Sequence, residues 1–190
     1  MFETAKAARI LKQPGNVAVI PTDTVYGLAA RAFDPDSVNR LYSLKQRDHK
    51  PGTLIAKDID QLRSLGLLRR YLKSVEQFWP GPVSVLIPVQ DSVKLNYLTL
   101  GRDSLAVRIP AQPSLIELLS LVGPLMTSSA NAPGEPTATT IEQARAYFKQ
   151  KVDAYFDGGD LSGRKPSTII RVIDDAVEVV REGAVKIAGA

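Results

Sequence analysis

Apolar residues along the chain form short runs and helical stripes that alternate without a fixed order. Apolar positions spaced by three and four residues predict helices over 3–13, 34–47, 114–123 and 140–150, with one or two more within 58–78. β-Branched runs bounded by Pro or Gly predict strands over 16–22, 53–56, 83–89 and 104–110, at the start of 124–131, and over 152–159, 167–173 and 177–182. With no repeat and no long linker, this mixture predicts one α/β domain over 1–190 with a mixed, strongly twisted sheet.

One of these helical stripes carries cations at its end. In the helix over 34–47, Asp36 is the expected N-cap. Lys45 lies seven residues after Val38, so it falls on the apolar face, and Arg47 follows where the helix should end. Such cations can simply complement the helix dipole. They also suit a triphosphate, because arginine binds oxygens bidentately and lysine acts as a mobile point charge.

Composition narrows the chemistry. The 190 residues carry a net charge of +4 with a pI near 9.3, a mild surplus compatible with an anionic ligand or RNA. The chain has no cysteine and a single histidine, His49, which excludes a disulfide scaffold and a multi-histidine metal site within one chain. No apolar run approaches the roughly 18 to 20 residues of a membrane span. The N-terminal segment contains Glu3 and no apolar signal core, so we expect a cytoplasmic protein.

Polar side chains gather after two of the apolar strands. The segment PTDTVYGLAA (21–30) reads as a connecting loop rich in hydroxyls. In TSSAN (127–131), three hydroxyl side chains and an amide side chain follow an apolar strand. Residues of these types satisfy local backbone groups in turns. Hydroxyls, amides and free backbone N–H groups also suit carboxylate or phosphate oxygens. The residues alone leave both interpretations open.

Two further features carry charge. Arg108 lies in the predicted strand SLAVRIP, where a buried arginine is usually paired or ligand-binding because a lone buried charge is very costly. The segment GGDLSGRK (158–165) has the glycine spacing of a P-loop, but Arg164 and Lys165 replace its Lys and Ser/Thr, and Pro166 opposes a following helix. We therefore expect residues 158–166 to form a flexible, Gly-rich connection that could close over a ligand.

Taken together, these segments resemble the YrdC-like threonylcarbamoyl-AMP synthase family in its short, single-domain form. The matching segments span residues 17 to 183 in the family's order: PTDTVYGL, LYSLKQR, WPGPVSVLIP, DSLAVRIP, TSSANAPG, STIIRV and REG. Any one of them is weak evidence. The K-x-R and S-x-N pair is fairly specific when it occurs with PT-x-x-V-Y-G and WPGP.

The resemblance implies a YrdC-like twisted mixed sheet flanked by helices, with a large basic concave cavity. The implied reaction condenses L-threonine, bicarbonate and ATP to threonylcarbamoyl-AMP and pyrophosphate. It also implies ATP as a substrate with Mg²⁺, no tightly bound cofactor, and tRNA threonylcarbamoyl transferase proteins as partners, with tRNA as a further candidate. The product serves biosynthesis of the N6-threonylcarbamoyladenosine modification of tRNA.

The resemblance also implies roles for individual residues. Positions that match those holding threonine in the family are Thr24, Arg108, Ser129 and Ser167. Positions that match those around ATP are Lys45, Arg47, Ser104, Asn131, Thr139 and Arg181, with a loose match at Thr139. The expected catalytic set is Lys45, Arg47, Ser129 and Asn131.

The chain departs from the family pattern on the threonine side. A histidine that binds threonine in longer members corresponds to Ala56, and the loop after Arg47 reads DHKPG. The alternative function is an RNA-binding module of the same fold, acting on double-stranded RNA or tRNA without ATP turnover. The modest net charge and the lack of a basic tract argue against that alternative.

Overall fold

The computed structural model describes residues 2–46, 50–90, 93–173 and 176–187. The strands in these ranges are β1 (Val17–Ile20), β2 (Gly27–Arg31), β3 (Thr53–Ile55), β4 (Val83–Pro88), β5 (Ser104–Arg108), β6 (Leu125–Ser129), β7 (Ala154–Tyr155), β8 (Thr168–Ile173) and β9 (Ala176–Arg181). The helices are α1 (Thr4–Leu11), α2 (Pro35–Leu44), α3 (Ile59–Ser64), α4 (Arg69–Ser74), the 3₁₀ turn η1 (Glu76–Phe78), α5 (Asn96–Thr99), α6 (Pro113–Val122) and α7 (Ile141–Phe148).

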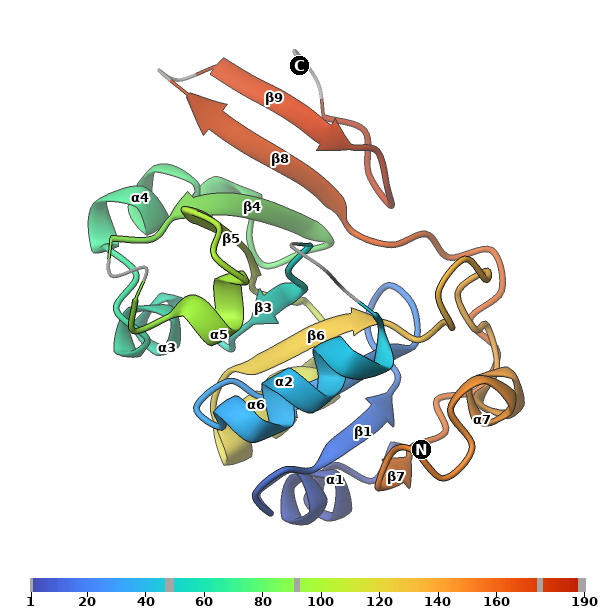
Figure 1. Cartoon of the computed structure of the whole chain (residues 1–190). Coiled ribbons are helices and arrows are strands. Elements are labelled where there is room, and N and C mark those ends of the chain that lie inside the picture. Colours follow the sequence, from blue (N-terminus) through green and yellow to red (C-terminus); the bar gives the residue numbers. More distant parts are fainter. Residues whose placement is uncertain (1, 47–49, 91–92, 174–175, 188–190) are drawn as a thin grey trace.

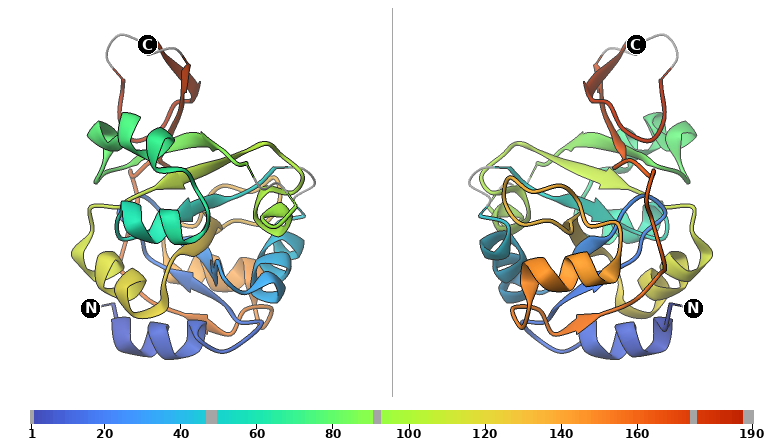
Figure 2. Two further views of the ribbon diagram at one scale, coloured as in Figure 1. Left: turned by 90° about the vertical axis from the view of Figure 1, so that its left-hand side faces the viewer. Right: turned by 90° about the vertical axis from the view of Figure 1, so that its right-hand side faces the viewer.

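The described strands form one mixed sheet in the order β7-β1-β2-β6-β3-β5-β4-β8-β9. Three pairs are parallel (β1–β7, β3–β5 and β4–β8) and the others are antiparallel, and helices flank the sheet (Figure 1). This confirms the predicted fold class. The β8–β9 hairpin extends from one end of the body in every view (Figures 1 and 2). No helix in the described ranges is long and apolar enough to cross a membrane.

Each face of the sheet has a different cover. Because successive side chains of a strand point to opposite faces, Leu54 and Met126 lie on one face, in the larger apolar cluster with α2. Ile55 and Leu125 lie on the other face, packed against α1 and α6. Helices α2 and α6 therefore cover opposite sides of the sheet, as Figure 2 shows.

Helices α1 and α6 cover only part of their face. Two residues along β3 and β6, on that same face, the apolar Ile55 and Leu125 give way to Thr53 and Thr127, which are opposite each other in register. These threonines line a cavity instead of the helix-covered cluster. The change from apolar to polar residues at alternate strand positions thus marks where the helix cover ends and the cavity begins.

The sequence analysis missed one strand and misplaced one helix cap. Residues 27–31 belong to β2 and pair with β1 and β6, whereas we read 21–30 as a loop. Small residues such as Gly27 and Ala29 give little strand signal, although β2 is buried between two neighbours. Within the predicted strand over 152–159, β7 is limited to Ala154–Tyr155.

Helix α2 begins at Pro35, so its N-cap is Asp34 and not Asp36. Proline is favoured at the first helical position because its missing N–H needs no partner there. The Asp34 carboxylate accepts hydrogen bonds from the backbone N–H groups of Asp36 (3.1 Å), Ser37 (3.3 Å) and Gly15 (2.8 Å), and from the Ser37 hydroxyl (2.6 Å). Burial alone would raise the pKa of Asp34, but these hydrogen bonds outweigh it and lower the pKa.

We predict that Asp34→Ala lowers the free energy of unfolding by about 1 to 2 kcal/mol at pH 7. Because the pKa of Asp34 is lower in the folded chain than its unfolded value of about 3.9, the charged cap's contribution is fully present above that value. It is lost as the pH falls through the folded pKa. Urea unfolding of wild type and variant at a series of pH values should show the difference shrinking in acid. A difference independent of pH would contradict this account, and Asp36→Ala should cost much less.

Candidate functional site

A cavity of about 340 Å³ lies over the uncovered part of the sheet. Serine and threonine side chains line much of it, together with the cations Lys50, Arg102, Arg108, Arg171 and Arg181. Aspartate and glutamate are absent from the described residues that line it. A concave site lined with cations and hydroxyls, with no carboxylate in this part of its wall, favours anionic ligands.

The cavity collects most of the residues that the sequence singled out. Thr24, Ser104, Arg108, Ser129, Ser167 and Arg181 all line it, although they are spread over the chain from the loop after β1 to the end of β9. Lys45 and Asn131 are outside the lining set but bond to Ser129. Thr139 is also outside it, with its hydroxyl bonded to Gln143. Arg47 and His49 lie outside the described residues.

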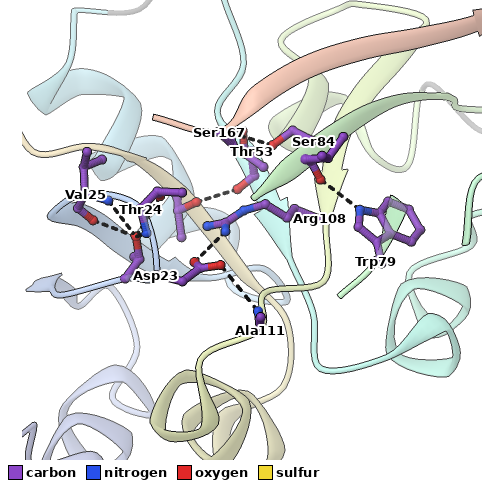
Figure 3. Close-up of polar contacts among 12 residues, drawn as sticks. Asp23, Thr24, Val25, Thr53, Trp79, Ser84, Arg108, Ala111 and Ser167 are labelled. Carbon is purple, nitrogen blue, oxygen red and sulfur yellow. Dashed lines mark hydrogen bonds and ion pairs between the residues drawn. The ribbon is translucent and has the colours of Figure 1, made fainter. Parts of the chain in front are cut away.

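Thr24 is held in place by a local turn. The Thr22 hydroxyl accepts hydrogen bonds from the backbone N–H groups of Thr24 and Val25, both at 3.2 Å, and donates to the Val25 carbonyl at 2.6 Å (Figure 3). The Thr22 and Thr24 hydroxyl oxygens are 3.0 Å apart. Thr22 therefore makes the turn, as the turn interpretation of this segment predicts, and the turn places Thr24 at the cavity.

Alternation along β5 places Ser104, Ala106 and Arg108 on the cavity face. Arg108 is only 4% exposed and pairs with Asp23 at 2.5 Å (Figure 3). Of the two expectations for a buried arginine here, a charged partner or a bound ligand, the structure shows the partner. Its Nε is also buried and has no hydrogen-bond partner in the described part of the chain.

Lys45 ties two segments together. It is the C-cap of α2 and is 7% exposed, on the apolar face as expected. Its ammonium donates to the backbone carbonyls of Ser129 (3.0 Å) and Asn131 (2.6 Å) and to the Asn131 side-chain oxygen (2.7 Å). The Ser129 hydroxyl donates to that same side-chain oxygen at 2.7 Å. The lysine of K-x-R thereby fixes the conformation of the S-x-N segment at the cavity edge.

The β9 end of the cavity is built by a close approach of two backbones. Arg181 donates to the Ser167 carbonyl at 2.6 Å, and the Ser167 hydroxyl bonds the buried Ser84 hydroxyl at 2.8 Å. A Cβ on Gly183 would lie 2.3 Å from the Pro166 carbonyl oxygen, so only glycine fits there. The REG segment therefore joins the hairpin to the cavity wall.

The connection over 158–166 is fastened at its start. The Tyr26 hydroxyl accepts from the Gly158 N–H at 2.8 Å and lies within donating distance of the Asp157 carboxylate and the Gly159 carbonyl. Burial raises the pKa of Tyr26, while hydrogen bonds from the Gly159 N–H and Tyr26 lower the pKa of Asp157. Residues 164–173, which the structure describes in full, contain no helix, in agreement with the rejected P-loop.

Three cations of the cavity escaped the sequence analysis, namely Lys50, Arg102 and Arg171. Arg171 follows Ile169 by two residues on β8, so strand alternation could have placed it on the cavity face. Two residues after Lys50, the backbone at Gly52 passes close to β6, and a Cβ on Gly52 would lie 2.2 Å from the Thr127 carbonyl oxygen. No group of three or more His, Cys, Asp or Glu within the described ranges could hold a metal ion.

Fold and cavity together define an α/β domain whose cavity, on the open part of a sheet face, suits small anionic ligands. The chain belongs to the Sua5/YciO/YrdC family, described as telomere recombination, whose sequence model matches residues 10–183. The family resemblance inferred from the motifs is thereby confirmed.

Individual relatives agree in sequence and fold. The threonylcarbamoyl-AMP synthase of Pseudomonas aeruginosa is 37% identical over 173 residues, which cover 90% of this chain and 92% of the relative. P. abyssi Sua5 complexed with L-threonine superposes with a TM-score of 0.83 at 30% identity over 95% of this chain. This chain spans 54% of that protein's length. E. coli YciO also superposes with a TM-score of 0.83, at 27% identity over 98% of this chain and 91% of YciO.

We predict that Lys45→Met destabilises the folded chain, because the substitution removes the charged donor shared by part-buried acceptors on Ser129 and Asn131. The expected loss is about 1 to 3 kcal/mol in the free energy of unfolding, measured with urea. The control is Lys12→Met on the exposed end of α1, which should change stability by less than about 0.5 kcal/mol. Equal, small effects of both substitutions would show that Lys45 does not hold the S-x-N segment.

Proposed function

We propose that this chain is a threonylcarbamoyl-AMP synthase, which condenses L-threonine, bicarbonate and ATP and releases pyrophosphate. The observation that carries this proposal is the shared cavity. Residues matched to threonine positions (Thr24, Arg108, Ser129 and Ser167) and to ATP positions (Ser104 and Arg181) line the same cavity. The relatives named for this activity, and the P. abyssi structure with L-threonine, support the assignment.

The chemistry suits a site of cations and hydroxyls. The neutral amine nitrogen of threonine bonds to the carbon of CO₂ and loses a proton, or bonds to the carbon of bicarbonate with the loss of water; either route forms a carbamate. A carbamate oxygen then bonds to the α-phosphorus of ATP, the bond from that phosphorus to the bridging oxygen breaks, and pyrophosphate leaves. Holding two anionic reactants together and neutralising the leaving group are the main demands, so positioning and electrostatics dominate.

The cations divide between the two substrates. Arg108 is placed to bind the carboxylate of threonine, since a guanidinium matches carboxylate geometry. Arg181, with Arg102 and Arg171, supplies positive charge for the phosphates. Lys45 acts from the cavity edge together with Asn131, and Arg47 and Thr139 complete the proposed ATP set. Mg²⁺ enters bound to ATP, because the described lining residues include no carboxylate to hold it.

The wider role follows from the product. We propose a single-domain, cytoplasmic enzyme with no tightly bound cofactor, whose adenylate is consumed by tRNA threonylcarbamoyl transferase proteins. The mixed anhydride of a carbamate and a phosphate is a reactive acyl donor, so its consumer should be close at hand. Direct binding of tRNA belongs to the same proposal as a candidate contact.

We predict that the purified protein releases pyrophosphate only when L-threonine, bicarbonate and ATP are all present. An enzyme-coupled pyrophosphate assay, with each substrate omitted in turn, measures this. Omission of any one should return the rate to the buffer background, because the leaving group departs only when the carbamate attacks. ATP consumption that is unchanged without threonine would overturn the proposal. Tight, steeply salt-dependent RNA binding without turnover would support the RNA-binding alternative instead.

A further inference from the structure

Asp23 lies behind the cavity wall, and none of the roles assigned above uses it. It belongs to the turn between β1 and β2 and is not among the residues that line the cavity. Its carboxylate connects this turn to the end of β5 and to the segment that follows β5. One oxygen accepts from an Nη of Arg108, on β5, at 2.5 Å, and the other accepts from the backbone N–H of Ala111 at 3.4 Å (Figure 3).

Burial makes this ion pair a strong constraint. The side chains of Arg108 and Asp23 are 4% and 13% exposed. A buried guanidinium needs a counter-charge, since water cannot solvate it there. Two of the three guanidinium nitrogens remain for other partners, and Nε is buried without one in the described chain. Asp23 thus holds one Nη of the guanidinium and leaves the other nitrogens for a ligand.

Covalent connection extends the constraint to a second residue of the cavity lining, Thr24. Asp23 precedes Thr24, whose backbone N–H and hydroxyl are held by Thr22. The chain through Thr24, Asp23 and Arg108 therefore spans from the loop after β1 to the end of β5. Without the pair, the long hydrogen bond from the Ala111 N–H is the one described hydrogen bond left between Asp23 and β5 or the segment after β5.

We propose that Asp23 is a positioning residue, which sets the spacing between Thr24 and Arg108 and turns the remaining guanidinium donors toward the carboxylate of the amino-acid substrate. The inference rests on the proposed function, because it takes threonine as the ligand of this wall. Asp23 does not touch the substrate. It makes binding depend on a free carboxylate, since only that group uses the donors that Asp23 holds in place.

The test is calorimetry of Asp23→Asn with three ligands: L-threonine, L-threoninamide and ATP. Loss of the charge should weaken L-threonine binding by about tenfold, roughly the effect of one charge-assisted hydrogen bond. Binding of L-threoninamide, which lacks the carboxylate, and of ATP should change less than about twofold. The ratio of affinities for threonine and its amide should therefore narrow, which a general loss of structure would not produce.

Two further variants keep the result interpretable. Asp60→Asn removes an exposed partner of Arg63 on α3 and should leave all three affinities unchanged. Asp23→Glu retains the charge at a different length, so it should bind threonine more tightly than Asp23→Asn and less tightly than wild type. If Asp23→Asn does not fold, wild-type threonine affinity in Asp23→Glu would overturn the spacing role.

The outcomes separate the inference from the proposed function. Wild-type protein that does not bind L-threonine would contradict the proposed function itself. Wild-type protein that binds threonine, with Asp23→Asn binding it equally well or losing threonine, threoninamide and ATP alike, would overturn only the role of Asp23.

Discussion

The structure depends on one constraint: each face of a sheet must be covered where its side chains are apolar. Helices α1 and α6 cover one face only as far as the apolar positions of β3 and β6 extend. Beyond that point alternation presents Thr53 and Thr127, so these two strands no longer offer apolar side chains for a helix to cover. The sequence of the strands therefore determines where the cavity forms. Substituting apolar residues there would remove the reason for the open face, so the site and the fold share one sequence pattern.

The second requirement of the site is that its cations stay fixed in position beside an open cavity. Three long side chains meet it in the same way, each with a protein oxygen as anchor. Lys45 bonds oxygens of the S-x-N segment, Arg108 pairs with Asp23, and Arg181 donates to the Ser167 carbonyl. Groups that are already oriented need little reorganisation when charge develops during phosphoryl chemistry. This explains how a site can serve a nucleotidyl transfer with hydroxyls and cations as its main groups.

The sequence predicted features that depend on neighbouring residues, namely most helices and strands and the family motifs. β-Branched runs and helical spacing located most elements, and motif order gave the family. Contacts between distant segments could not be deduced, because they depend on sheet register. Nothing near Lys45 indicates that its ammonium reaches residues more than eighty positions away. Strand β2 was missed for a different reason. Gly27 and Ala29 are small residues that fit between the neighbouring strands β1 and β6, and they carry no strand signal of their own. The cavity position of Arg171 could have been predicted, because alternation along the expected strand over 167–173 puts it on the same face as Ser167.

The central claim is that one cavity holds threonine and ATP at the same time. Calorimetric titration of L-threonine into protein saturated with an ATP analogue, whose α–β bridge cannot be cleaved, tests it most directly. The account predicts that the saturated protein still binds one threonine per chain, with an affinity no weaker than that of the free protein. Loss of threonine binding in the presence of the analogue would mean that the two ligands exclude each other, and would contradict the account.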